Sequence, residues 1–196
     1  FCSAHSLSAD VLYQIEELRQ QYFSYLIDTG FVQVDTDTRN ALARRRSRQG
    51  RPRLMDIPAH LDTYGQSVPV VTLALVTAMY PKLLQVDEKT QQMRTLTNNQ
   101  PAAVHPSSVN ARRALGTPST HFVLYHAIVY LHRLYAWETA VVDDRMVLLV
   151  GGDAEFKHTS RSMYIDQNRV RMSTYDAPSL VALRVLRAQL KDILQT

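Results

Sequence analysis

Short strand-like runs follow one another through the middle of this 196-residue chain, and they constrain its fold more than any other feature. Apolar residues, many of them β-branched or aromatic, fill each run, and polar turns separate the runs. The runs cover residues 83–86, 93–96, 102–104, 122–129 and 134–142, with two shorter candidates at 163–165 and 170–172. Several strands this short at this spacing favour a sheet that closes on itself. The sequence therefore predicts a mainly β protein built on a small barrel.

Helical patterns flank the predicted strands. Ser8 can cap a helix whose apolar residues recur every three or four positions until the chain reaches Gly30. The segment 68–79 is apolar on nearly every face, which is typical of a buried helix, and Pro81 ends it. Asp176 can cap a last helix, whose stripe of leucine and isoleucine continues to residue 194. We therefore expect helices before and after the barrel, and we expect the helix over 68–79 to be buried.

The segment between residues 31 and 66 loses this periodicity and concentrates positive charge. No acidic residue lies between Asp37 and Asp56, whereas seven arginines do: Arg39, Arg44, Arg45, Arg46, Arg48, Arg51 and Arg53. Since the whole chain carries +4, removing these seven charges would leave −3. Such a basic patch suits phosphate, an acidic protein or anionic lipid, and a solvated loop without a ligand is an equal alternative. We place a domain boundary here, which predicts one region over 1–66 and a second over 67–196.

Composition excludes several classes of protein. The longest nearly apolar run, 68–79, is far shorter than the roughly 20 residues that a membrane-spanning helix needs. Cys2 is the single cysteine, so no internal disulfide can form, and we expect a cytoplasmic or nuclear location. The histidines show no metal-ligand spacing, and Asp143-Asp144 reads as a turn rather than a catalytic pair. A start without methionine or a leader pattern leads us to expect a piece of a longer protein.

Five landmarks, in order, carry a resemblance to a known family. They are Phe-Cys-Ser at 1–3 ahead of a helix with Leu-Arg-Gln-Gln-Tyr at 18–22, then the segments 74–81, 104–109, 122–126 and 148–152. In this order and spacing they resemble the C-terminal region of DEAH/RHA-type ATP-dependent RNA helicases. The resemblance implies the end of a helical ratchet-like domain followed by an oligonucleotide-binding (OB) barrel that a C-terminal helix closes. It also implies that single-stranded RNA threads between these modules and two ATPase lobes, which would use ATP and Mg²⁺.

The chain itself lacks the motifs of that motor. Neither a Gly-x-x-x-x-Gly-Lys-Ser/Thr loop nor an Asp-Glu-x-His tetrad occurs in the sequence. We therefore expect this chain alone to bind no cofactor and to hydrolyse no ATP, while the whole protein would be the helicase. The basic segment between 31 and 66 has no counterpart among the matched landmarks.

Candidate RNA contacts centre on the turn that follows residue 104. Hydroxyl, amide, imidazole and guanidinium groups can meet phosphates, 2′-hydroxyls and base edges. The candidates in this turn are His105, Ser107, Ser108, Asn110, Arg112 and Arg113. Tyr125 could offer a stacking face and Lys157 a charge, although packing is the simpler role for Tyr125. The alternative for the turn is that its serines only satisfy the backbone while its arginines face solvent.

Three functions fit these observations. The first is an RNA-binding accessory module that contacts single strands beside the ATPase lobes, with little sequence preference. The second is a protein-interaction module that docks a regulator or a ribonucleoprotein. The third is a scaffold that ties the ATPase lobes to the ratchet-like domain and binds no ligand.

Overall fold

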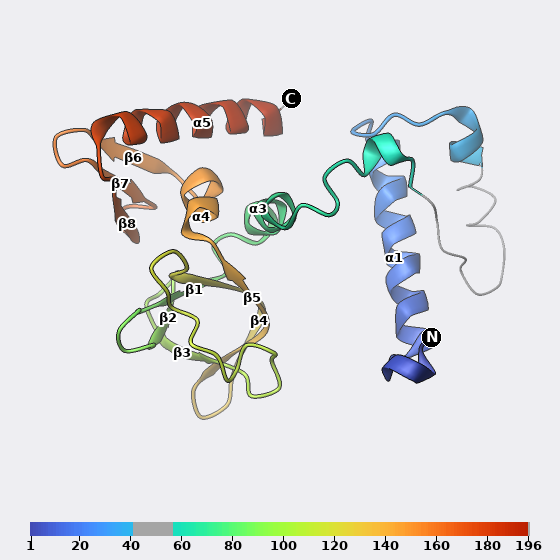
Figure 1. The fold of residues 1–196 in the computed structure, drawn as a ribbon, viewed down its shortest axis with the longest axis horizontal. Helices are drawn as coiled ribbons and strands as arrows, with labels where there is room; N and C mark the ends of the chain where they lie inside the picture. Colours follow the sequence, from blue (N-terminus) through green and yellow to red (C-terminus); the bar gives the residue numbers. More distant parts are fainter. Residues whose placement is uncertain (41–56, 196) are drawn as a thin grey trace. The chain divides into compact units, whose positions relative to one another are not determined.

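The structure is a computed structural model that describes residues 1–40 and 57–195. The chain divides into two compact units, Phe1–Thr63 and Tyr64–Thr196 (Figure 1). The predicted boundary at residue 66 stays a prediction about domains. Six arginines of the basic segment lie outside the described residues, and they are Arg44, Arg45, Arg46, Arg48, Arg51 and Arg53.

The first unit is built around helix α1 (Ala9–Asp28), which a short 3-10 turn (Ser3–His5) precedes. The Ser8 hydroxyl accepts a hydrogen bond from the Val11 amide at 3.4 Å, so the predicted N-terminal cap is confirmed. Near the other end, Phe23 and Ile27 pack against a few residues that include Leu61 of a second 3-10 turn (Ala59–Leu61). The rest of the apolar stripe of α1 is exposed, as at Val11, Ile15, Leu18 and Tyr22.

The second unit contains the predicted barrel. Its strands are β1 (Leu83–Val86), β2 (Met93–Thr95), β3 (Pro101–Val104), β4 (Phe122–Tyr130) and β5 (Leu134–Val142). The sheet closes in the order β1-β2-β3-β5-β4, with β3 and β5 parallel and the other neighbours antiparallel. The strands begin and end within one residue of the predicted runs: β3 gains Pro101, β4 gains Tyr130 and β2 loses residue 96. The barrel prediction is confirmed.

Strand β1 and the first part of β4, Phe122–Tyr125, carry buried side chains on both faces. One face of each points into the barrel, where Leu84 and Val123 pack with Tyr125. The other face carries Leu83 and Phe122, which join a second core outside the barrel. This second core forms where helices and a further sheet cover one side of the barrel, so β1 and β4 lie between two packed layers.

Helix α3 (Val68–Met79) covers part of that second core but is not buried as predicted. Val76 is its single buried residue in the described structure, whereas Val68, Val70, Val71 and Leu75 are 43–74% exposed. A helix that is apolar all round needs neighbours on every side, and within this unit the main contacts of α3 are with α4 and β4. The apolar composition of residues 68–79 therefore predicted a more deeply buried helix than the second unit contains.

Helix α4 (Asp144–Val150) was not among the predicted elements. The residues read as a turn begin it, since the Asp143 carboxylate caps the helix by accepting from the Arg145 amide at 2.9 Å. Asp144 accepts from the backbone amide of His121 at 2.6 Å, which ties the start of α4 to the start of β4. The pair Asp143-Asp144 is thus a helix start rather than a free turn.

A small second sheet and a long helix complete the unit. The sheet has the order β6-β7-β8, with β6 (Ala154–Lys157), β7 (Ser162–Ile165) and β8 (Val170–Ser173). Helix α5 (Ala177–Gln195) follows, and the predicted cap is present because the Asp176 carboxylate accepts from the Ser179 amide at 2.7 Å. Leu180 of α5 packs with Met163 and Ile165 of the sheet. The predicted fold, a mainly β barrel with flanking helices and a C-terminal helix, is confirmed.

A polar cluster fixes α5 to the turn between α4 and β6. The Arg187 guanidinium donates to the carbonyls of Leu148, Gly151 and Gly152 at 2.5–2.6 Å, and burial lowers its pKa. A Cβ on Gly152 would lie 2.0 Å from the Asp166 carboxylate, which accepts a hydrogen bond from the Tyr80 hydroxyl. Burial, followed by this carboxylate, raises the Tyr80 pKa. The charge of Arg187 is therefore engaged within the fold by these carbonyl groups.

Two searches of the described residues bear on function. No helix in the described ranges is both long enough and apolar enough to cross a membrane. Likewise, residues 1–40 and 57–195 contain no group of three or more His, Cys, Asp or Glu side chains placed to hold a metal ion.

Candidate nucleic-acid interface

The turn after β3 places His105 on an aromatic cluster. Strand β3 pairs in parallel with β5, Val104 opposite Ala136, so residue 105 lies beside Trp137. The His105 ring stacks on the Trp137 indole with ring centres 3.6 Å apart at 19°, and it meets Tyr135 edge-on at 5.7 Å. The Ser107 amide donates to His105 Nδ1 at 3.2 Å, and the Ser107 hydroxyl lies 2.7 Å from the same nitrogen. His105 is thus a half-buried member of an aromatic cluster with Tyr135 and Trp137.

Ser108 and Asn110, by contrast, direct their polar groups into the protein. Asn110 is 7% exposed, and its amide donates to the Thr139 carbonyl at 2.8 Å and to the Thr139 hydroxyl at 3.0 Å. The Ser108 hydroxyl lies 2.9 Å from the same hydroxyl. Strand β3 pairs with β5 only as far as Ala136, and the Asn110 amide takes up the carbonyl of Thr139 further along β5. Asn110 is therefore corrected from an RNA contact to a structural residue, and Ser108 supports it.

Tyr125 also proves to be internal. It is 5% exposed and packs inside the barrel with Leu84 and Val123. Burial raises the pKa of its hydroxyl. The prediction that Tyr125 stacks on a base is wrong. Both faces of β4 are covered over Phe122–Tyr125, so every side chain in this part of the strand is buried.

The remaining predicted residues lie at the surface in two places. Ser107, Arg112 and Arg113 are exposed in the loop that follows β3. Lys157 ends β6 in the second sheet, where its amine lies 4.7 Å from the Tyr164 ring centre and 3.7 Å from the Glu155 carboxylate. The structure therefore brings the loop residues together but assigns Lys157 to a different sheet.

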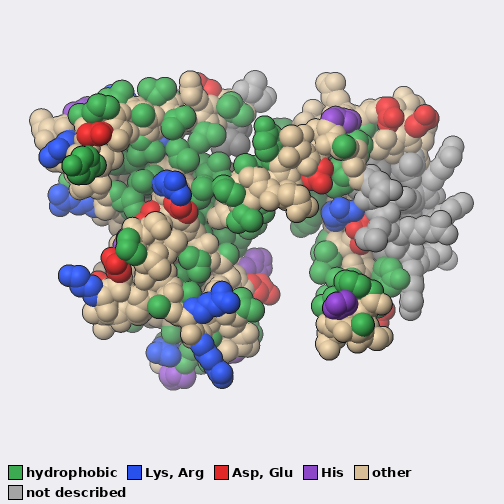
Figure 2. Space-filling view, viewed as in Figure 1, with side chains coloured by type: hydrophobic (Ala, Val, Ile, Leu, Met, Phe, Trp, Pro, Cys, Tyr) green, Lys and Arg blue, Asp and Glu red, His purple; other side chains and the backbone are tan. Residues whose placement is uncertain are grey.

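The structure adds two arginines that sequence reasoning missed. A hollow of about 410 Å³ lies over β2 and β3, and Arg94 and Arg133 both line it. Arg94 donates to the Asn99 carbonyl at 3.0 Å, and the Arg133 guanidinium lies 5.0 Å from the Tyr135 ring centre. Arg94 belongs to β2 and Arg133 to the β4–β5 turn, far apart in sequence, so only the closure of the barrel brings them together. In Figure 2, Lys and Arg side chains gather over the lower part of the barrel.

Gln91 joins this hollow to the loop after β3. Its side-chain oxygen accepts from the amides of Leu115 and Gly116 at 2.9 and 3.1 Å, and its nitrogen donates to the Gly116 carbonyl at 2.9 Å. A Cβ on Gly116 would lie tightly against the loop's surroundings, 3.0 Å from Val86 Cγ1. The β1–β2 loop therefore holds the far end of the loop that carries Arg112 and Arg113.

Comparison with known proteins identifies the class of domain. Residues 71–154 match the family model OB_NTP_bind, described as an oligonucleotide/oligosaccharide-binding (OB) fold. The second unit is thus an OB-fold domain, of a kind typical of the C-terminal region of DEAH/RHA helicases.

Two curated relatives agree with this class. The chain is 25% identical over 154 residues to the DExH-box ATP-dependent RNA helicase DExH1 of Arabidopsis thaliana, covering 78% of this chain and 13% of the relative. It is 28% identical over 174 residues to the ATP-dependent RNA helicase DHX29 of Homo sapiens, covering 85% of this chain and 11% of that protein. The resemblance read from the landmarks is confirmed. The chain spans about an eighth or less of the length of these relatives.

Proposed function

We propose that this chain is an RNA-binding accessory module of an ATP-dependent RNA helicase, and that single-stranded RNA crosses the β2–β3 face of its barrel. OB folds bind oligonucleotides on the face of strands 2 and 3, between the loop joining strands 1 and 2 and the loop joining strands 4 and 5. The observation that carries the proposal is the position of Arg94 and Arg133 in a hollow at this place. Both relatives are named as RNA helicases.

Each group on this surface has a role that its chemistry suggests. Arg94 and Arg133 would neutralise phosphates, and Arg112 and Arg113 would add charge from the neighbouring loop. The exposed part of the His105 ring would contact a base, with the ring supported by the stacked Trp137 indole. Phosphate charge and stacking are common to all four bases, so we expect little sequence preference.

The proposal extends to the whole protein as its relatives suggest. ATP and Mg²⁺ would bind to ATPase lobes outside this chain, and those lobes would be its first partner. A cytoplasmic or nuclear location would fit both the single cysteine and an RNA substrate. The basic patch formed by residues 44–53 would add a second contact with RNA or with a ribonucleoprotein.

Fluorescence anisotropy of a labelled ten-nucleotide RNA, titrated with the 196-residue chain at two salt concentrations, tests the proposal. Replacing Arg94 and Arg133 by alanine should weaken binding about tenfold and lower the log–log salt slope by about 1.4, or about 0.7 for each lost phosphate contact. A matched control replaces Arg169 and Arg171, two exposed arginines of the second sheet, and should change neither value. Equal losses in both variants would show a nonspecific charge effect and would contradict the proposed face. An Arg44/Arg45/Arg46→Ala variant measures the share of the basic patch.

A further inference from the structure

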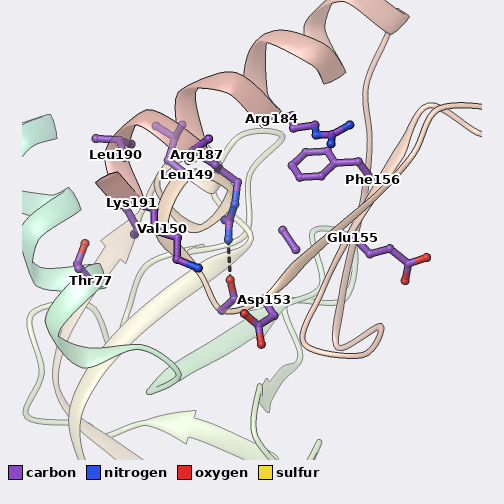
Figure 3. A pocket seen from close by; sticks show the side chains of 13 residues that line it. Thr77, Leu149, Val150, Asp153, Glu155, Phe156, Arg184, Arg187, Leu190 and Lys191 are labelled. Atoms are coloured by element: carbon purple, nitrogen blue, oxygen red, sulfur yellow. Dashed lines mark hydrogen bonds between the residues drawn. The ribbon is translucent and has the colours of Figure 1, made fainter. Parts of the chain in front are cut away.

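A groove of about 740 Å³ lies on the second unit, away from the β2–β3 face (Figure 3). Helix α5 forms one side and β6 the other, and the end of α4 and Thr77 of α3 complete the lining. Apolar side chains contribute much of the surface, and they include Leu149, Val150, Phe156 and Leu190. These side chains are half-buried, so a ligand that covers them would remove apolar area from water.

One side of the groove is an unpaired strand edge. Strand β6 pairs with β7 alone, so its opposite edge has no partner strand within the described residues. The Asp166 amide donates to the Asp153 carbonyl at 2.9 Å, which makes this a hydrogen-bonded pair. Because such pairs alternate along an antiparallel ladder, Glu155 and Lys157 bond to β7, while Ala154 and Phe156 turn their backbone groups to the open edge. Exposed edges of this kind accept an added strand.

The other side of the groove carries two uncompensated positive charges. Arg184 and Lys191 lie two turns apart on α5, both exposed, and neither makes an ion pair or side-chain hydrogen bond in the described part of the chain. Arg187, between them, differs because three backbone carbonyls occupy it. The two acids of the lining are also engaged, since Glu155 lies 3.7 Å from the Lys157 amine and Asp153 interacts electrostatically with Arg187.

We propose that this groove binds an extended acidic peptide segment of a partner protein, which adds a strand to the free edge of β6. Ala154 and Phe156 would supply the main-chain hydrogen bonds, and the apolar lining would receive alternate side chains of the peptide. Arg184 and Lys191 would face its carboxylates.

Nucleic acid fits these features less well than a peptide. Phosphates could use the two cations, but an RNA strand has no repeating amide and carbonyl groups to pair with a strand edge. The aromatic side chains proposed above to stack on bases lie instead at His105 and Trp137. The peptide surface and the RNA surface therefore use different residues and can be tested separately.

The test begins with a random ten-residue peptide library displayed on phage and selected against the 196-residue chain. We expect enriched peptides to combine acidic residues with alternating large apolar residues. A synthetic labelled copy of the most enriched sequence is then titrated by anisotropy against the wild type and against an Arg184→Glu/Lys191→Glu variant. The double reversal should weaken binding at least tenfold, since two attractive contacts become repulsive. Bound peptide should also slow hydrogen exchange at the Ala154 and Phe156 amides.

A matched variant, Arg112→Glu/Arg113→Glu, carries the same charge change on the barrel loop and should leave peptide affinity within about twofold. Both pairs are exposed, and circular dichroism checks that each variant remains folded. Failure to select any peptide that depends on Arg184 and Lys191 would overturn the proposal. So would a reversal that weakens binding of the ten-nucleotide RNA while leaving the peptide unaffected. An Arg94/Arg133→Ala variant should keep its peptide affinity even if it loses RNA, which separates this proposal from the proposed RNA-binding function.

Discussion

The loop after β3 and the neighbouring β2–β3 face make opposite use of their polar side chains. In the loop, Asn110 and Ser108 turn inward and satisfy Thr139 of β5. On the face, the guanidinium groups of Arg94 and Arg133 line an open hollow. The comparison teaches that a polar residue is available to a ligand when its contacts within the fold leave some of its donors unused, as the five N–H groups of a guanidinium allow.

Replacing Gln91 is the strongest test of this comparison. Gln91 lines the hollow, but its side-chain hydrogen bonds hold the loop that follows β3. Gln91→Ala removes four side-chain hydrogen bonds and leaves the amides of Leu115 and Gly116, both buried, without a partner. We expect a loss of about 3 kcal/mol in the free energy of unfolding, measured by urea denaturation. Gln92→Ala, a change of the exposed neighbour, serves as control and should cost less than about 0.5 kcal/mol. Similar losses for the two variants would show that the hydrogen bonds of Gln91 do not hold the loop after β3.

Asn110→Ala should give the next largest effect. The change leaves the Thr139 carbonyl without its donor, and we expect the free energy of unfolding to fall by about 2 kcal/mol. Ser107→Ala, in the exposed part of the same loop, should change stability little. RNA affinity of folded Asn110→Ala protein should match the wild type. A stable Asn110→Ala protein that had lost RNA binding would restore Asn110 as a ligand contact and break the comparison.

The arginines of the face should show the reverse behaviour. Arg94→Ala/Arg133→Ala should lower RNA affinity about tenfold, or about 1.4 kcal/mol, with little change in the free energy of unfolding. Both side chains make local contacts only, Arg94 with the Asn99 carbonyl and Arg133 with the Tyr135 ring. Combined anisotropy and urea unfolding of the same preparation checks both expectations. A loss of stability as large as that of Asn110→Ala would show that these arginines stabilise the fold, as Asn110 does.

The two regions also show which parts of this structure a sequence can predict. The strands of the barrel and the caps at Ser8 and Asp176 follow from local patterns, and they lie where those patterns place them. Helix α4 escaped because its short apolar run has no length to distinguish helix from strand. The burial of Tyr125 depends on β4 being covered on both faces, which no alternation within the strand reveals. Likewise Arg94 and Arg133 meet through the parallel pairing of β3 with β5, a contact between distant segments.

Asp143 extends the comparison to a charged side chain whose contacts lie within the fold. Its carboxylate caps α4 and pairs with the Arg145 guanidinium, and these contacts, the side-chain bond first, hold its pKa below the ordinary value. A carboxylate with a lowered folded-state pKa contributes stability above its unfolded pKa, near 3.9, and this contribution is lost as the pH falls through the lower folded value. Asp143→Asn should therefore cost about 0.5 kcal/mol at pH 7, a small value because Arg145 is largely exposed. Unfolding in urea at pH 7 and near pH 3 measures the cost, which should shrink as the wild-type carboxylate becomes protonated. The same cost at both pH values would assign the effect to the hydrogen-bond geometry of the cap rather than to the charge of Asp143. The comparison between the charge of Asp143 and the arginines of the β2–β3 face would then no longer hold.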